Sequence, residues 1–163
     1  MRVFTRTLGH MTPASCQSLA DHRFLAGLAR YQIEDLATLA TQVEFSENDV
    51  ILSDGQRSAY FYFLIRGSVA VELRTPRYVV CVEALGPSQV FGWSALLDQQ
   101  DTLFQVRARE ATTVFRIDGA ALKRKCREEP SLGTEILQRT LQVVAGRVKA
   151  TEIRFAEMCG VRV

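Results

Sequence analysis

The stretch Tyr60-Phe-Tyr-Phe-Leu-Ile-Arg-Gly-Ser-Val-Ala-Val71 joins two runs of aromatic and β-branched residues through Arg66-Gly67. Such runs favour strands, and a glycine between them favours a hairpin or a corner. Five further runs of this kind lie on both sides, at residues 43–45, 50–52, 78–84, 104–108 and 112–117. Because turn residues separate the runs at short intervals, the pattern predicts an antiparallel barrel or jelly roll.

Helical periodicity flanks the predicted strands on both sides. Residues 23–41 are compatible with two short amphipathic helices. After Asp118 the pattern stays helical, and it predicts a short helix over residues 119–127 and a longer one over about 131–158. We therefore expect a mainly β domain with flanking helices over residues 21–158, between a polar N-terminal tail at 1–20 and a short tail at 159–163.

The long final helix carries two apolar stripes. One stripe has the alternating spacing of four and three residues that is typical of a seam between two helices; it contains Leu137, Leu141, Val144, Val148, Thr151, Phe155 and Met158. The other stripe, expected to face the protein's own barrel, contains Leu132, Ile136, Val143 and Ala150. Two stripes on one helix predict a homodimer through the seam; the alternative is one broad face buried within the monomer.

Composition excludes several classes of protein. The 163 residues fit one ordinary domain, with 47% apolar and 23% charged residues and a net charge of +2. This balance does not indicate a nucleic-acid-binding protein. The four cysteines lie far apart, and no apolar run is long enough to span a bilayer, so neither a metal centre nor a membrane protein is expected. A cytoplasmic protein with reduced thiols is the prediction.

Catalytic motifs do not occur in the sequence, so an enzyme is not predicted. A different feature draws attention, Leu85-Gly-Pro-Ser-Gln-Val-Phe-Gly-Trp-Ser-Ala-Leu-Leu97, in which a strand end passes into a helical turn after Gly92. Backbone N–H groups that converge at such a turn could bind a small anion. The alternative is that Phe91-Gly92 forms a corner and that Trp93 is an ordinary core aromatic.

These residues resemble the cyclic-nucleotide-binding domain of catabolite activator protein and its relatives. The resemblance rests on residues 60–71, on Leu85-Gly-Pro-Ser-Gln-Val-Phe-Gly92, and on Val106-Arg-Ala108 followed by residues 114–118. It implies an eight-stranded jelly roll with N-terminal helices, a phosphate-binding cassette and a long C-terminal dimerisation helix. The ligand-binding residues implied by the match are Phe91, Gly92, Trp93, Ser94, Ala95, Leu96, Thr102 and Leu103.

The sequence departs from this family at the two positions that best define nucleotide recognition. Trp93 stands where relatives that bind cyclic AMP have a glutamate for the ribose, and Thr102 stands where they have an arginine for the cyclic phosphate. Arg107 has the opposite strand parity to Thr102 and should point away from the pocket. Thr151 falls where some members contact the purine, although it is equally compatible with a polar position in the seam.

The resemblance therefore implies a non-catalytic regulatory or sensor module. We expect it to bind cyclic AMP or cyclic GMP weakly, or a different small ligand, and to signal to an unidentified partner protein through a homodimer helix. The family's DNA-reading domain would follow the long helix, and only five residues follow Met158 here, so direct DNA binding is not expected. The alternative is a degenerate, ligand-free domain used for dimerisation or as a scaffold.

Overall fold

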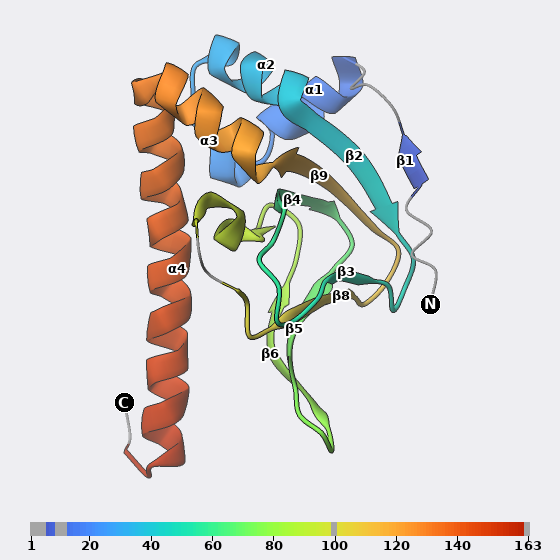
Figure 1. Cartoon of the computed structure of the whole chain (residues 1–163), viewed down its shortest axis with the longest axis vertical. Helices are drawn as coiled ribbons and strands as arrows, with labels where there is room; N and C mark the ends of the chain where they lie inside the picture. Colours follow the sequence, from blue (N-terminus) through green and yellow to red (C-terminus); the bar gives the residue numbers. More distant parts are fainter. Residues whose placement is uncertain (1–5, 9–12, 99–100, 162–163) are drawn as a thin grey trace. The chain divides into compact units, whose positions relative to one another are not determined.

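Two antiparallel sheets form the β part of the chain in the computed structural model, which describes residues 6–8, 13–98 and 101–161 (Figure 1). The first sheet has the strand order β1-β2-β9-β4-β7 and the second has the order β3-β8-β5-β6. The strands are β1 Arg6–Leu8, β2 Ala40–Phe45, β3 Val50–Leu52, β4 Tyr60–Arg66, β5 Val69–Arg74, β6 Val79–Leu85, β7 Val90–Phe91, β8 Gln105–Ala108 and β9 Thr112–Asp118.

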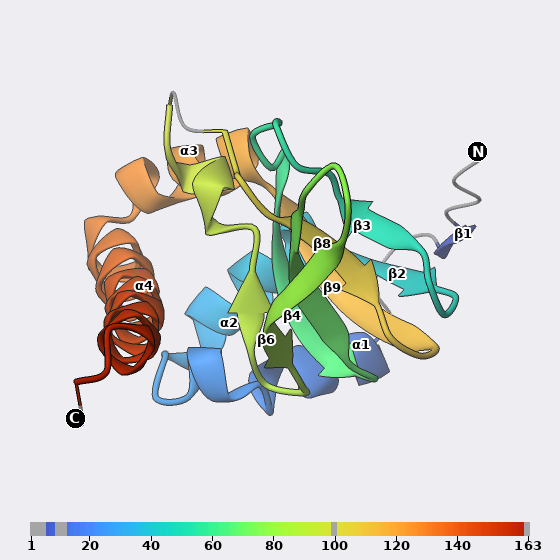
Figure 2. The ribbon, with the colours of Figure 1, turned by 90° about the horizontal axis from the view of Figure 1, so that it is seen from below.

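The chain crosses repeatedly between the two sheets, which is the connectivity of a jelly roll. Strands β2 to β9 form the predicted eight-stranded structure, so the predicted fold class is confirmed. Strand β4 lies inside the first sheet, between β7 and β9, and Figure 2 shows it beside β9. Its side chains are buried on both faces, since Tyr62 and Leu64 belong to the core between the sheets while Phe61 and Phe63 contact the ring of Phe24.

The predicted N-terminal tail contains ordered structure, which corrects the expectation for the described part of residues 1–20. Strand β1 pairs antiparallel with β2, and residues Pro13–Ala20 form helix α1. Residues 1–5 and 9–12 of the predicted tail lie outside the described residues. Pro13 is the first residue of α1, a position that suits proline because the first N–H groups of a helix have no partner within it. Leu19 is fully buried, so α1 contributes to the core.

Short helices follow α1, as predicted for residues 23–41. They are a 3₁₀ turn, η1, at Arg23–Leu25 and helix α2 at Arg30–Leu39. The side-chain oxygen of Gln32 accepts a hydrogen bond from the backbone N–H of Ala29 at 3.1 Å. Because this N–H has no partner within the helix, the contact stabilises the beginning of α2.

The side chain of His22 is buried between η1 and the sheet core. Its Nδ1 accepts a hydrogen bond from the backbone N–H of Phe24 at 3.2 Å, and its ring contacts the Phe63 ring edge-on at 5.4 Å. Burial lowers the pKa of His22 below its ordinary value of 6.5, an effect opposed by the carbonyl oxygens of Gln89 and Leu64. The neutral ring is therefore the form that the folded chain favours.

Acid is expected to destabilise the fold through His22. Because the pKa of the folded state lies below that of the unfolded state, this contribution is complete above pH 6.5 and decreases as the pH falls below it. The loss is at most about 1.4 kcal/mol for each pH unit. His22→Asn keeps an acceptor for Phe24 and cannot titrate, so urea unfolding should show a weaker pH dependence for the variant. An unchanged dependence would contradict this role.

The contacts within the chain divide it into two units, Met1–Lys125 and Cys126–Val163. Helix α3, Gly119–Glu128, spans the boundary, and the Asp118 carboxylate accepts a hydrogen bond from the backbone N–H of Ala121 at its beginning. Helix α4, Pro130–Met158, forms most of the second unit and agrees with the predicted helix. No helix in the described part is both long and apolar enough to cross a membrane.

Candidate functional site

The predicted cassette, residues 91–97, begins on the first sheet. Strand β7 places Phe91 opposite Tyr62 of β4, and a short 3₁₀ turn, η2, follows at Trp93–Leu96. Gly92 connects the two with a φ of 75°, a left-handed conformation that favours glycine. The strand end and the helical turn after Gly92 that the sequence indicated are present, and Gly92 forms the corner that the alternative interpretation expected.

Gly92 also lies against β4 with no room for a side chain. A Cβ atom at this position would lie 2.5 Å from the carbonyl oxygen of Tyr60 and 2.7 Å from Cδ2 of Tyr62. The Gly119 backbone is equally close to the cassette, since a Cβ there would lie 2.5 Å from the carbonyl oxygen of Ala95. These two close approaches hold the cassette between β4 and the beginning of α3.

Ser94 connects the cassette to the loop before β4. Its hydroxyl oxygen accepts a hydrogen bond from the backbone N–H of Ser58 at 3.2 Å, and the Ser58 hydroxyl donates to the carbonyl oxygen of Tyr60 at 2.5 Å. Both serines are buried, with 5% and 1% of their surface exposed. The Ser94 hydroxyl therefore has a structural partner already, in addition to the ligand-binding role that the sequence predicted.

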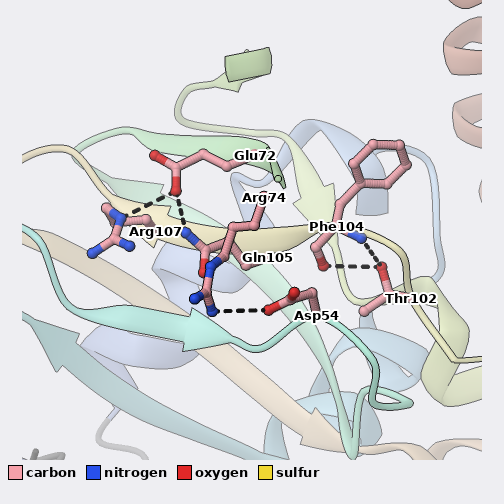
Figure 3. Close-up of polar contacts among 7 residues, drawn as sticks. All are labelled: Asp54, Glu72, Arg74, Thr102, Phe104, Gln105 and Arg107. Atoms are coloured by element: carbon pink, nitrogen blue, oxygen red, sulfur yellow. Dashed lines mark hydrogen bonds and ion pairs between the residues drawn. The ribbon is translucent and has the colours of Figure 1, made fainter. Parts of the chain in front are cut away.

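Thr102 and Leu103 lie in the loop before β8. The Thr102 hydroxyl donates to the carbonyl oxygen of Phe104 and accepts from its backbone N–H, both at 3.1 Å (Figure 3). Leu103 is 68% exposed. In this conformation, the Thr102 hydroxyl stabilises its own loop.

Arg107 lies on the face of β8 opposite the core residue Val106, as predicted from strand parity. Its Nε donates to the Glu72 carboxylate at 3.1 Å (Figure 3). Its guanidinium also donates to the carbonyl oxygen of Asn48 at 3.0 Å. Gln105 donates to the same Glu72 carboxylate. Because these partners are on the outer face of the sheet, Arg107 does not replace the missing cassette arginine.

Aromatic rings line the inner face of the first sheet beside the cassette. Tyr62 and Phe91 stack with centroids 4.6 Å apart and planes 7° from parallel. The guanidinium carbon of Arg116 lies 4.1 Å from the centroid of the Tyr60 ring. Burial raises the pKa of Tyr62 to about 12, against the opposite effects of the charge and hydrogen bond of Arg116. The sequence interpretation did not include Arg116, although alternation from Val114 places it on this face.

The remaining cassette residues differ in exposure. Ala95 is buried, whereas Trp93 and Leu96 are half-buried. Within the described residues, no group of three histidine, cysteine, aspartate or glutamate side chains could hold a metal ion.

Helix α4 carries the other predicted functional residues. The seam residues Leu137, Leu141, Val148 and Phe155 are exposed, and Val144 is half-buried. The Thr151 hydroxyl is exposed and donates to the carbonyl oxygen of Arg147 at 2.9 Å within the helix. Thr151 belongs to the second unit, so its contact with a base stays a prediction.

A family model for the cyclic nucleotide-binding domain matches residues 42–129, which is more than half of the chain. No curated protein matches the sequence.

Similar solved structures include two bacterial proteins and one protozoan protein. A putative cyclic nucleotide-binding protein from Geobacter metallireducens GS-15 is 25% identical, with a TM-score of 0.71 over 82% of this chain and 98% of the other. A cyclic nucleotide-binding domain from Methylobacillus flagellatus KT is 16% identical, with a TM-score of 0.81 over 94% of this chain and 89% of the other. The regulatory subunit of a cAMP-independent protein kinase A from Trypanosoma brucei is 24% identical, with a TM-score of 0.64; the match covers 77% of this chain and 45% of that one.

Proposed function

Because this chain belongs to the cyclic nucleotide-binding domain family, we propose that it is a non-catalytic regulatory module with an altered ligand-binding cassette. The observation that carries the proposal is the position of residues 91–97, which begin with the last residue of β7 and turn at Gly92 directly against β4. This position supports a cassette that keeps the family's backbone, in which Trp93 and Thr102 alter the side chains that would recognise a nucleotide.

The altered side chains predict weak binding of a cyclic nucleotide or binding of a different small ligand. A charge-assisted hydrogen bond contributes about 1.5–3 kcal/mol, so exchanging an arginine for Thr102 weakens phosphate binding roughly tenfold to a hundredfold. The Thr102 hydroxyl also has both of its contacts within its own loop. Neither Thr102 nor Trp93 supplies a charge to a ligand.

The output of the module, in this proposal, is a homodimer formed through α4. The exposed seam residues form the surface that a second copy would cover, and an unidentified partner protein would read the state of the dimer. The four cysteines are free thiols, which fits a reducing, cytoplasmic compartment.

A ligand-free scaffold is the second candidate function. The stack of Tyr62 on Phe91 favours it, because these two rings occupy part of the interior between the sheets. In this case the domain would keep its fold and its dimer helix without responding to a nucleotide.

Restoring the two family residues is expected to strengthen nucleotide binding. The double variant Trp93→Glu, Thr102→Arg should bind cyclic AMP at least about tenfold more tightly than the wild-type chain in calorimetric titration. The matched control is Trp93→Glu, Leu103→Arg, which introduces the same residues but places the arginine at the neighbouring, exposed position. The control should not gain affinity.

Titration of the wild-type chain distinguishes the two candidate functions. A ligand-dependent rise in melting temperature with cyclic AMP or cyclic GMP at up to millimolar concentration supports the regulatory module. If neither nucleotide changes the melting temperature of the wild-type chain or of the double variant, the scaffold function is favoured instead.

A further inference from the structure

Arg116 points into the interior of the jelly roll. It lies on β9 two residues after the core residue Val114 and pairs in register with Tyr62 of β4, which also belongs to the core. Alternate residues of a strand share a face, so Arg116 lies on the inner face of the first sheet. Its guanidinium carbon is 4.1 Å from the centroid of the Tyr60 ring on the same face.

The charge of Arg116 has no carboxylate partner in the described part of the chain. None of the ion pairs within residues 6–8, 13–98 and 101–161 includes Arg116. Its Nε atom is buried and makes no hydrogen bond. Tyr60 and Tyr62 supply a ring face and a hydroxyl to the half-buried guanidinium, and neither supplies a negative charge. Buried polar groups in folded proteins normally have hydrogen-bond partners, so the buried Nε of Arg116 needs an explanation.

The unpaired guanidinium shares its neighbours with the cassette. Tyr60 and Tyr62 are the residues against which the Gly92 backbone lies, and Phe91 stacks on Tyr62. Arg116, Tyr62 and Phe91 lie opposite one another on the neighbouring strands β9, β4 and β7, so Arg116 shares the inner face with the first cassette residue. The only arginine on β8, Arg107, points to the outer face.

We propose that Arg116 binds the anionic group of the ligand, a phosphate, and so replaces the cassette arginine whose position is occupied by Thr102. This inference rests on the proposed function and names the residue that recognises the ligand. A guanidinium can donate two parallel hydrogen bonds to a phosphate, and the Tyr60 ring lies against the Arg116 guanidinium. The phosphate belongs either to a nucleotide or to free inorganic phosphate.

Arg116→Met and its matched control Arg66→Met test this role. Each variant removes one arginine from the first sheet, Arg116 on the inner face and Arg66 at the exposed end of β4. Binding of cyclic AMP, cyclic GMP, inorganic phosphate and uncharged adenosine is measured by calorimetry and by thermal shift. Arg116→Met is expected to lose about tenfold to a hundredfold in affinity for the phosphate-bearing probe that the wild-type chain binds. Arg66→Met should bind it as the wild-type chain does, and adenosine should not distinguish the variants.

Arg116→Lys provides a second comparison, including the case in which the methionine variant does not fold by circular dichroism. Lysine keeps the charge but cannot donate in the paired geometry, so an intermediate loss is expected. If Arg116→Met binds the phosphate-bearing probe as tightly as the wild-type chain does, the proposal is overturned. If only Arg116→Lys folds, wild-type affinity of that variant overturns it. The absence of any Arg116-dependent response to all three phosphate probes overturns it as well.

The arms of this experiment separate the inference from the proposed function. If nucleotide binding does not depend on Arg116, the proposed regulatory module is supported and the proposed role of Arg116 is overturned. Binding of inorganic phosphate alone, lost in Arg116→Met, supports the role of Arg116 and removes the nucleotide from the proposed function.

Discussion

Replacing Gly92 with alanine is expected to lower the free energy of unfolding by about 2–4 kcal/mol. Two costs add at this position. The φ of 75° is strained for any residue with a Cβ, and that atom would lie 2.5 Å from the carbonyl oxygen of Tyr60 and 2.7 Å from the Tyr62 ring. Because β4 is paired on both sides, with β7 and β9, neither the backbone of Tyr60 nor the stacked ring of Tyr62 can move away at little cost.

Gly55→Ala is the matched control for this prediction. Gly55 has a φ of 70° in the β3–β4 loop, but a Cβ there would have nothing within 4 Å. Its replacement should therefore cost only the backbone strain, about 1 kcal/mol. Thermal or urea unfolding of both variants measures the difference. Equal losses would mean that the close approach of the cassette to β4 contributes nothing.

The strands were predictable from sequence because each combines a local pattern with a turn signal. The prediction of strands at 50–52 and 60–65 agrees closely with β3 and β4, and helix α4 begins one residue before its predicted beginning. Strand β1 was missed because its stability depends on pairing with β2, which lies more than 30 residues away in the chain. A three-residue segment carries too little local pattern to reveal such a partner.

The candidate site was predictable to the extent that it depends on backbone conformation. A glycine between a strand end and a helical turn correctly predicted the corner at Gly92. The hydrogen bond from Ser58 to Ser94 could not be predicted, because it joins residues 36 positions apart. Arg116 was overlooked because the prediction of its strand considered only propensity, whereas strand parity from Val114 places its charge inside.

Glutamates in the α4 seam are expected to convert the proposed homodimer into monomers. Leu141 and Val148 are 67% and 51% exposed, so Leu141→Glu, Val148→Glu should leave the fold of one chain intact. In a symmetric dimer the two changes remove four apolar side chains from the interface and place four carboxylates there. Each buried apolar side chain contributes about 1.5–3 kcal/mol, so the dissociation constant should increase by several orders of magnitude.

The mass in solution gives the result, measured by light scattering. The wild-type chain should have twice the single-chain mass of 18.3 kDa, and the glutamate variant should have the single-chain mass. The control Gln142→Glu, Lys149→Gln makes the same total change in charge at two exposed polar positions of α4 outside the seam, so it should remain dimeric. A wild-type monomer, or a glutamate variant of unchanged mass, would contradict the α4 dimer. Loss of the dimer in the control as well would attribute the effect to charge rather than to the apolar stripe.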